Sequence, residues 1–192
     1  MNQDFRNKVN RLLKAKMSKE RYHHSLCVSS EAKNLAKHYK EDEDKAEIAG
    51  LLHDITKEFS KEEHLKIVNG YKIKLSKVER STPKLWHAIT APFYVKEMFN
   101  IEDEDILNAI RYHTTGKKNM SSLEKIVFLA DFVSEDRFKE FSDAKKAKEI
   151  AYKNLDQGVL YELVHSVNKL VAKKSLLCLD TVKAYNYYVM NT

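Results

Sequence analysis

Residues 46–57 read Ala-Glu-Ile-Ala-Gly-Leu-Leu-His-Asp-Ile-Thr-Lys, an apolar helical stretch that ends in the adjacent pair His53-Asp54. Ala46, Ala49 and His53 are spaced i, i+3 and i+7, so the imidazole faces the same way as the core residues. A carboxylate buried beside that ring is costly unless a cation or strong hydrogen-bond donors compensate for the lost water. A metal ion would supply that compensation.

Two other helical patterns also direct a polar side chain towards the core. Asp131 ends the i+4 stripe that Leu123 and Val127 begin, and His113 ends the face that contains Ile106 and Ile110. Taken alone, a buried histidine is more often bonded to a carbonyl, and a buried aspartate is often a cap or an ion-pair partner. Three helices with the same anomaly favour a shared metal site.

The candidate ligands supply only nitrogen and oxygen donors. That donor set suits iron, manganese, magnesium, nickel or cobalt better than a structural zinc centre. The candidates are His24, His53, Asp54, His87, His113 and Asp131.

Helical periodicity dominates the whole chain, which predicts an all-α fold of eight or nine helices in a single domain, residues 1–192. We expect the metal-site core at about 18–137 and C-terminal helices at about 142–192, with a break near 174–180. Pro92 predicts either a kink or a new helix start at Thr90. The expected helix boundaries are a first helix ending near Met17, N-caps at Ser18, Thr82 and Asp103, an acidic start at 41–44, capping boxes at Ser60–Glu63 and Ser121–Glu124, and a C′ stop at Gly70.

The composition excludes several classes of protein. The 192 residues carry a net charge of +6 but include only 4 Gly and 2 Pro, too few for the turns of a β-sandwich, and no Gly-rich phosphate loop is present. Cys27 and Cys178 lie far apart and suit two small buried residues in a reducing compartment. No apolar stretch is long enough to span a membrane or to form a signal peptide, so we expect a cytoplasmic protein.

The ordered pattern of histidines and aspartates resembles that of the HD-domain metal-dependent phosphohydrolase superfamily. The chain is most similar to the bacterial YqeK family of symmetrically cleaving diadenosine-tetraphosphate hydrolases. The resemblance rests on four blocks between Arg21 and Arg137, with a weaker echo at Thr181–Asn186. The four blocks are Arg21–Leu26, Ala49–Lys57, Ile110–Gly116 and Leu129–Arg137.

The resemblance implies an HD-domain helical bundle that hydrolyses a dinucleoside polyphosphate into two nucleoside diphosphates. It implies catalytic roles for Asp54, Lys57, His87 and His113, and a metal, most simply iron, on His24, His53, Asp54 and Asp131. His87 and His113 then either hold a second metal or contact phosphate. The implied substrate-binding residues are Arg21, His24, Lys57, His87, His113, Arg137 and Asn186. A glycine often follows the His87 position in that family, whereas Ala88 stands here, so the orientation of His87 is the least specified.

The remaining histidines and the tyrosines near the C-terminus have simpler interpretations. His23 lies about 100° around its helix from His24 and cannot easily share its site. His38, His64 and His165 are expected at the surface or in packing, as are the tyrosines at 185, 187 and 188.

Two other functions remain open at this stage. Another HD activity, such as a 5′-nucleotidase, a dNTP triphosphohydrolase or a cyclic-nucleotide phosphodiesterase, would use the same metal residues. The net positive charge also permits a nucleic-acid-binding helical module, although Lys and Arg are dispersed and mixed with acids. We therefore expect a small nucleotide substrate, no membrane partner, no nucleic acid, and a homodimer as one oligomeric option.

Overall fold

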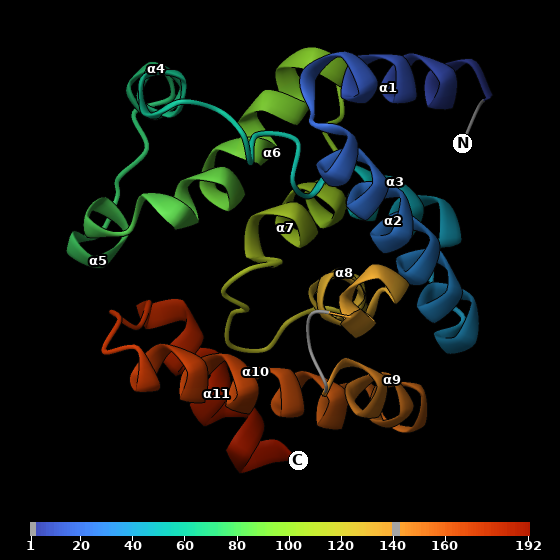
Figure 1. Cartoon of the computed structure of the whole chain (residues 1–192), viewed down its shortest axis with the longest axis vertical. Helices are drawn as coiled ribbons and strands as arrows, with labels where there is room; N and C mark the ends of the chain where they lie inside the picture. Colours follow the sequence, from blue (N-terminus) through green and yellow to red (C-terminus); the bar gives the residue numbers. More distant parts are fainter. Residues whose placement is uncertain (1–2, 140–142) are drawn as a thin grey trace.

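The computed structural model describes residues 3–139 and 143–192, and that part of the chain is helical without a strand (Figure 1). Eleven α-helices and two 3₁₀ helices follow in order: α1 Gln3–Lys16, α2 Lys19–Tyr39, α3 Glu43–Leu52, α4 Lys61–Gly70, α5 Lys77–Ser81, η1 Pro83–Leu85, α6 Trp86–Phe99, α7 Glu104–Tyr112, α8 Ser122–Val133, η2 Glu135–Lys139, α9 Ala144–Lys153, α10 Leu155–Ala172 and α11 Leu179–Asn191. The predicted all-α fold is confirmed.

Side-chain caps start four of these helices at the residues that the sequence predicts. The Ser18 hydroxyl accepts from the Arg21 amide, and Asp103 accepts from the first turn of α7. Ser60 and Ser121 form complete capping boxes with the glutamates three residues later. Each cap satisfies amides that the helix itself leaves without a partner, and so fixes where the helix begins.

Several boundary predictions were wrong. The predicted helix count was too low, partly because the capping box of Ser76 with Glu79, which starts the short α5, was overlooked. Gly70 is the last residue of α4 rather than its C′ stop, and the left-handed residue of that turn is Lys72, with φ of 53°. Thr82 makes no side-chain cap, and Pro83 begins a 3₁₀ turn instead of an α-helix.

Pro92 lies inside α6, which runs unbroken from Trp86 to Phe99, so no new helix starts at Thr90. The predicted start of the C-terminal helices at residue 142 lies outside the described residues, and the break near 174–180 is confirmed between α10 and α11. Cys178 is buried as expected, whereas Cys27 is only half-buried; both are free thiols.

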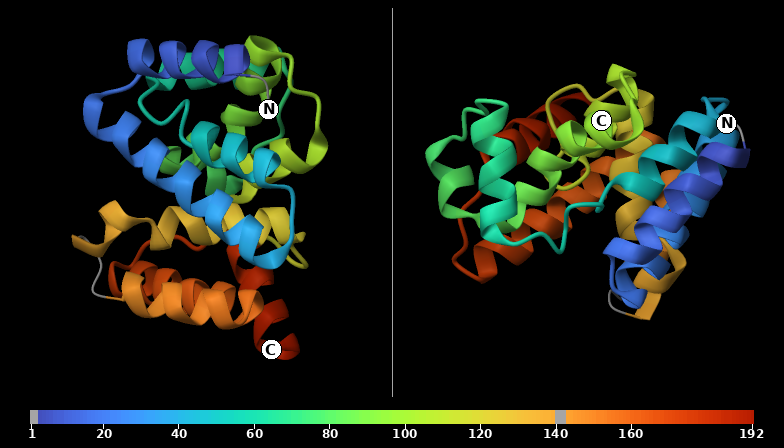
Figure 2. Two further views of the ribbon diagram at one scale, coloured as in Figure 1. Left: turned by 90° about the vertical axis from the view of Figure 1, so that its right-hand side faces the viewer. Right: turned by 90° about the horizontal axis from the view of Figure 1, so that it is seen from above.

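Helix α8 occupies the centre of the molecule and contacts α2, α3, α7, α9 and α10. Figure 2 shows α8 between the upper helices, which include α2 and α3, and the C-terminal helices α9–α11. Because α8 is packed on several sides, its residues 126–130 are all buried. One hydrophobic cluster extends from Val9 to Tyr188. A continuous core of this kind is compatible with the predicted single domain.

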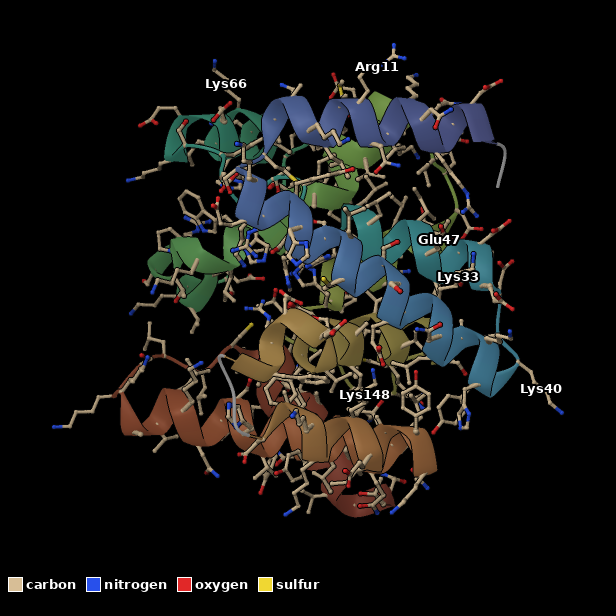
Figure 3. The ribbon with its side chains drawn as sticks, turned by 45° about the vertical axis from the view of Figure 1, so that its right-hand side comes forward. Arg11, Lys33, Lys40, Glu47, Lys66 and Lys148 are labelled. Carbon is tan, nitrogen blue, oxygen red and sulfur yellow. The ribbon has the colours of Figure 1, made fainter. Side chains whose placement is uncertain are left out.

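The interface of α2 with α3 places the first site residues. Gly50 of α3 sits so close to α2 that a Cβ there would lie 3.0 Å from the Ser29 Cα and the Val28 carbonyl oxygen. At the outer edge of the same interface, Lys33 and Glu47 form an ion pair of 2.9 Å (Figure 3). Among the described residues, no helix is long and apolar enough to cross a membrane.

Candidate metal centre

Five helices bring six predicted ligands together at the middle of the fold. The contributing elements are α2, the end of α3, the first turn of α6, the end of α7, and α8. We call the assembled residues the His–Asp cluster: His24, His53, Asp54, His87, His113 and Asp131.

Three of the four histidines are oriented by the same local hydrogen bond. The Nδ1 atoms of His53, His87 and His113 each lie 2.7 Å from the carbonyl oxygen three residues earlier, on Gly50, Lys84 and Ile110. A carbonyl can only accept, so each Nδ1 carries the proton and each Nε2 presents its lone pair. His53 and His113 sit at helix C-caps and His87 in a first turn, so the rings extend into the space between helices.

The four rings contact one another in sequence. The ring centroids lie 5.3 Å apart for His24 and His53, 4.8 Å for His53 and His113, and 5.1 Å for His113 and His87. The two carboxylates face this row. Asp131 Oδ1 lies 2.9 Å from His24 Nε2. Asp54 Oδ1 lies 3.2 Å from His87 Nε2 and 3.5 Å from His113 Nε2.

The cluster has polar atoms that the described protein leaves without hydrogen bonds. His53 Nε2 and Asp54 Oδ1 are fully buried, and neither has a hydrogen-bond partner within residues 3–139 and 143–192. Two such atoms at one point carry a large desolvation cost unless a ligand compensates for it. The ligand atoms of His24, His53 and Asp131 lie within 4.8 Å of one another, as do those of His53, Asp54 and His113. This donor set fits a metal ion.

Electrostatics keep both carboxylates in the form that binds a metal. Burial alone would raise their pKa values and is the largest single effect at each carboxylate. It is outweighed at Asp54 by the neighbouring imidazoles and the Lys57 ammonium acting together, and at Asp131 by the hydrogen bond with His24 together with the Arg137 guanidinium. Each pKa is therefore held well below its usual value. Burial also opposes charge on His24, yet its hydrogen bonds with Asp131 and Asp136 raise the pKa of this ring to about 9, so a metal ion must displace the proton of His24 when it binds there.

His87 and His113 behave differently from His24. Burial lowers the pKa of both rings, and the nearby ammonium of Lys57 lowers that of His87 further. Both imidazoles are neutral near pH 7, which is the form that coordinates metals.

Three predicted phosphate-contacting cations also meet the cluster. Arg21 Nη1 lies 2.7 Å from Asp54 Oδ2, and Lys57 Nζ lies 3.0 Å from His87 Nε2. Arg137 Nη2 lies 2.9 Å from Asp131 Oδ1 and 3.2 Å from His24 Nε2. Their side chains are only partly exposed, so each guanidinium or ammonium borders both the cluster and solvent.

Two residues that the sequence did not predict contact the His–Asp cluster, and one predicted site residue does not. Asp136 Oδ2 lies 2.7 Å from His24 Nδ1, and Thr114 Oγ1 lies 3.1 Å from His87 Nε2. Both lie inside matched sequence blocks, but neither has a helical spacing that points inward. Asn186 is exposed on α11, and no contact in the described part of the chain joins it to the cluster.

The histidines expected to pack do so. His64 Nδ1 bonds the Thr90 hydroxyl at 2.9 Å in the core, and His38 bonds the Tyr152 carbonyl at 2.8 Å. His165 packs on Phe132 with ring centroids 4.9 Å apart. Tyr188 is buried, as its interpretation as a packing residue predicts.

Comparison with known proteins agrees with this geometry. The HD domain family model matches residues 21–136. A protein of Halalkalibacterium halodurans named bis(5′-nucleosyl)-tetraphosphatase, symmetrical, is 36% identical over 96% of this chain and 97% of its own length. A Bacillus subtilis protein of the same name is 33% identical over 92% and 94%.

A solved structure matches as well. The crystal structure of a predicted HD superfamily hydrolase involved in NAD metabolism, from Clostridium acetobutylicum, superposes with a TM-score of 0.93 at 33% identity and covers 97% of each chain. The chain therefore belongs to the HD domain family, in the same group as the symmetrical bis(5′-nucleosyl)-tetraphosphatases.

Proposed function

We propose that this chain is a metal-dependent hydrolase that cleaves diadenosine tetraphosphate and related dinucleoside polyphosphates symmetrically, giving two nucleoside diphosphates. The observation that carries the proposal is the buried pair of His53 Nε2 and Asp54 Oδ1, which make no hydrogen bond within the described residues and lie inside a cluster that three cations border. The names of the relatives support the choice of substrate.

His24, His53, Asp54 and Asp131 would hold the metal, and His87 and His113 are the residues for a second ion. We propose iron as the metal; manganese, magnesium, cobalt and nickel would suit the same donors. When bound, the metal supplies Lewis acidity for activating water and polarising a phosphoryl group. The neutral state of His87 and His113 favours metal or phosphate contact over donating a proton to the leaving group.

The chain's own residues then have distinct tasks. Asp54 and Asp131, which remain ionised, can accept hydrogen bonds from the attacking water and orient it towards phosphorus. Arg21, Lys57 and Arg137 offset the charge that develops on the equatorial and leaving oxygens. The ion pair with Asp54 holds the Arg21 guanidinium at the edge of the cluster. A substrate phosphate bound at the cluster is therefore within reach of that guanidinium.

Product chromatography tests the proposal. Diadenosine tetraphosphate should give ADP alone, whereas AMP together with ATP would contradict symmetrical cleavage. A substrate panel separates the other HD activities, because a turnover preference for monophosphates, dNTPs or cyclic nucleotides would displace this assignment. In Asp54→Ala, metal content and turnover should fall together.

The nucleic-acid-binding alternative predicts a different result for Asp54→Ala, with RNA or DNA binding intact and no hydrolysis to lose. It has little support in charge distribution, because many cations are paired with acids. Arg6, for example, contacts both Asp44 and Glu47, and Lys148 contacts Glu31. The cytoplasmic location and the homodimer remain predictions.

A further inference from the structure

The three cations meet the row of histidine rings at different points. Arg137 contacts His24, the first ring of the row, and Lys57 contacts His87, the last ring. Arg21 contacts Asp54 between them. A linear polyanion laid along the row can therefore meet one cation at each end and one near its middle.

A pocket continues the row beyond Lys57. It has a volume of about 420 Å³ and lies between the turn after α3, the start of α4 and the η1–α6 junction. A volume of this size lies within the range of roughly 300–1,000 Å³ typical of small-molecule sites. Its lining residues are Lys57, Phe59, Lys61, His64, Pro83, Lys84, Trp86 and His87.

The walls of this pocket combine two kinds of chemistry. Trp86 and His64 are held in place by buried hydrogen bonds, from Trp86 Nε1 to the Glu79 carbonyl at 2.7 Å and between His64 Nδ1 and Thr90 Oγ1 at 2.9 Å. Lys61 and Lys84 are exposed and also line the pocket. A nucleotide has the complementary pair of features, a flat aromatic base and an anionic phosphate chain.

We propose that this pocket, which we call the Trp86 pocket, binds one nucleoside diphosphate half of the substrate. The inference rests on the proposed function and adds where one half of the dinucleotide lies. Lys57 holds phosphate at the junction between the cluster and the pocket, Lys61 and Lys84 attract the outer phosphate, and the base lies against the aromatic wall. The scissile central linkage then spans the cluster, and the other half extends towards Arg137.

Trp86 provides a direct readout, because it is the only tryptophan in the chain. The holoenzyme is titrated with a diadenosine tetraphosphate analogue whose central bridging oxygen is replaced by a methylene group, so that it binds without being cleaved. Binding in the Trp86 pocket should change the fluorescence emission of Trp86. The analogue concentration that gives half of the full emission change, the titration midpoint, should match the inhibition constant of the analogue.

Charge reversal tests the role of the two rim lysines. In Lys61→Glu/Lys84→Glu we expect the midpoint and the KM for diadenosine tetraphosphate to rise about tenfold, with metal content retained and kcat changed far less. The matched control is Lys66→Glu, on the same helix as Lys61 but outside the pocket, where Lys66 points into solvent (Figure 3). It should shift neither value by more than about twofold.

The outcome separates the two proposals. If the analogue inhibits hydrolysis while Trp86 emission stays constant, or if the double variant keeps the wild-type midpoint, the pocket assignment is overturned. If the wild type converts diadenosine tetraphosphate to products other than ADP, the proposed function fails instead. The titration needs no turnover, so it tests the pocket in either case.

Discussion

Replacing Gly50 by alanine should damage both the stability and the metal affinity of the protein. The added Cβ would lie 3.0 Å from the Ser29 Cα and from the Val28 carbonyl oxygen, and 3.1 Å from the Ala32 Cβ. Two of these three are backbone atoms that cannot rotate away, so α2 and α3 must separate. Overpacking of this kind costs about 1–3 kcal/mol, and the better helix propensity of alanine returns about 1 kcal/mol. We expect a net loss of up to about 2 kcal/mol.

The separation would act directly on the His–Asp cluster. Helix α2 carries His24, whereas His53 and Asp54 end α3, and the Gly50 carbonyl itself orients the His53 ring. Displacing one helix from the other by a few tenths of an ångström alters ligand geometry, so metal affinity should fall severalfold. Urea unfolding and a metal-competition titration measure the two effects.

Two other glycines serve as controls. Gly70→Ala places its Cβ in open space at the end of α4 and should be neutral or stabilising. Gly158→Ala would bring a Cβ to 2.8 Å from the Ala151 Cα between α9 and α10, so it should destabilise the fold while metal affinity persists. The reasoning is refuted if Gly50→Ala matches the wild type in both measurements, or if Gly158→Ala loses as much metal affinity.

Three further perturbations address the surroundings of the cluster. Burial raises the pKa of Glu162 from 4.5 to about 7, so the folded wild type loses stability as the pH rises from 4.5 to 7. Glutamine does not titrate, so in urea unfolding the free energy of unfolding of Glu162→Gln should rise relative to that of the wild type by about 3 kcal/mol between pH 4.5 and 8. A difference that stays constant with pH would contradict this. Asp136→Asn removes the carboxylate charge that faces His24 Nδ1 and should weaken metal binding by about tenfold with helix content unchanged. An unaltered dissociation constant for the metal would argue against the role of Asp136. Removing the metal with a chelator should lower the thermal midpoint, and adding it back should restore the midpoint; no shift in either direction would be inconsistent with a native-state metal site.

Local sequence signals predicted the inward placement of the candidate ligands where a helix ended in one. His53 and His113 occupy C-caps at the end of apolar faces, so their helical spacing alone directs them inward. Asp131 stands within α8 and breaks an apolar stripe, which is equally visible. For these three residues the physics of burial and the periodicity of the chain lead to the same conclusion.

Other features depend on tertiary contacts that no local pattern contains. Asp136 reaches His24 from a 3₁₀ turn more than 100 residues away in sequence. Pro92 lies within α6, which packs against α4 and α7, and these tertiary contacts offset the missing backbone hydrogen bond. The Trp86 pocket joins three short segments that touch only in the folded chain.

Metal analysis of the wild type and Asp54→Asn tests the central claim most directly. Asparagine keeps the shape of Asp54, which is 1% exposed, but removes the negative charge that faces five neighbouring side chains. The wild type should contain at least one equivalent of metal per chain, and the folded variant should contain far less and hydrolyse no diadenosine tetraphosphate. A folded Asp54→Asn protein with wild-type metal content, or an active wild type free of metal, would contradict the account.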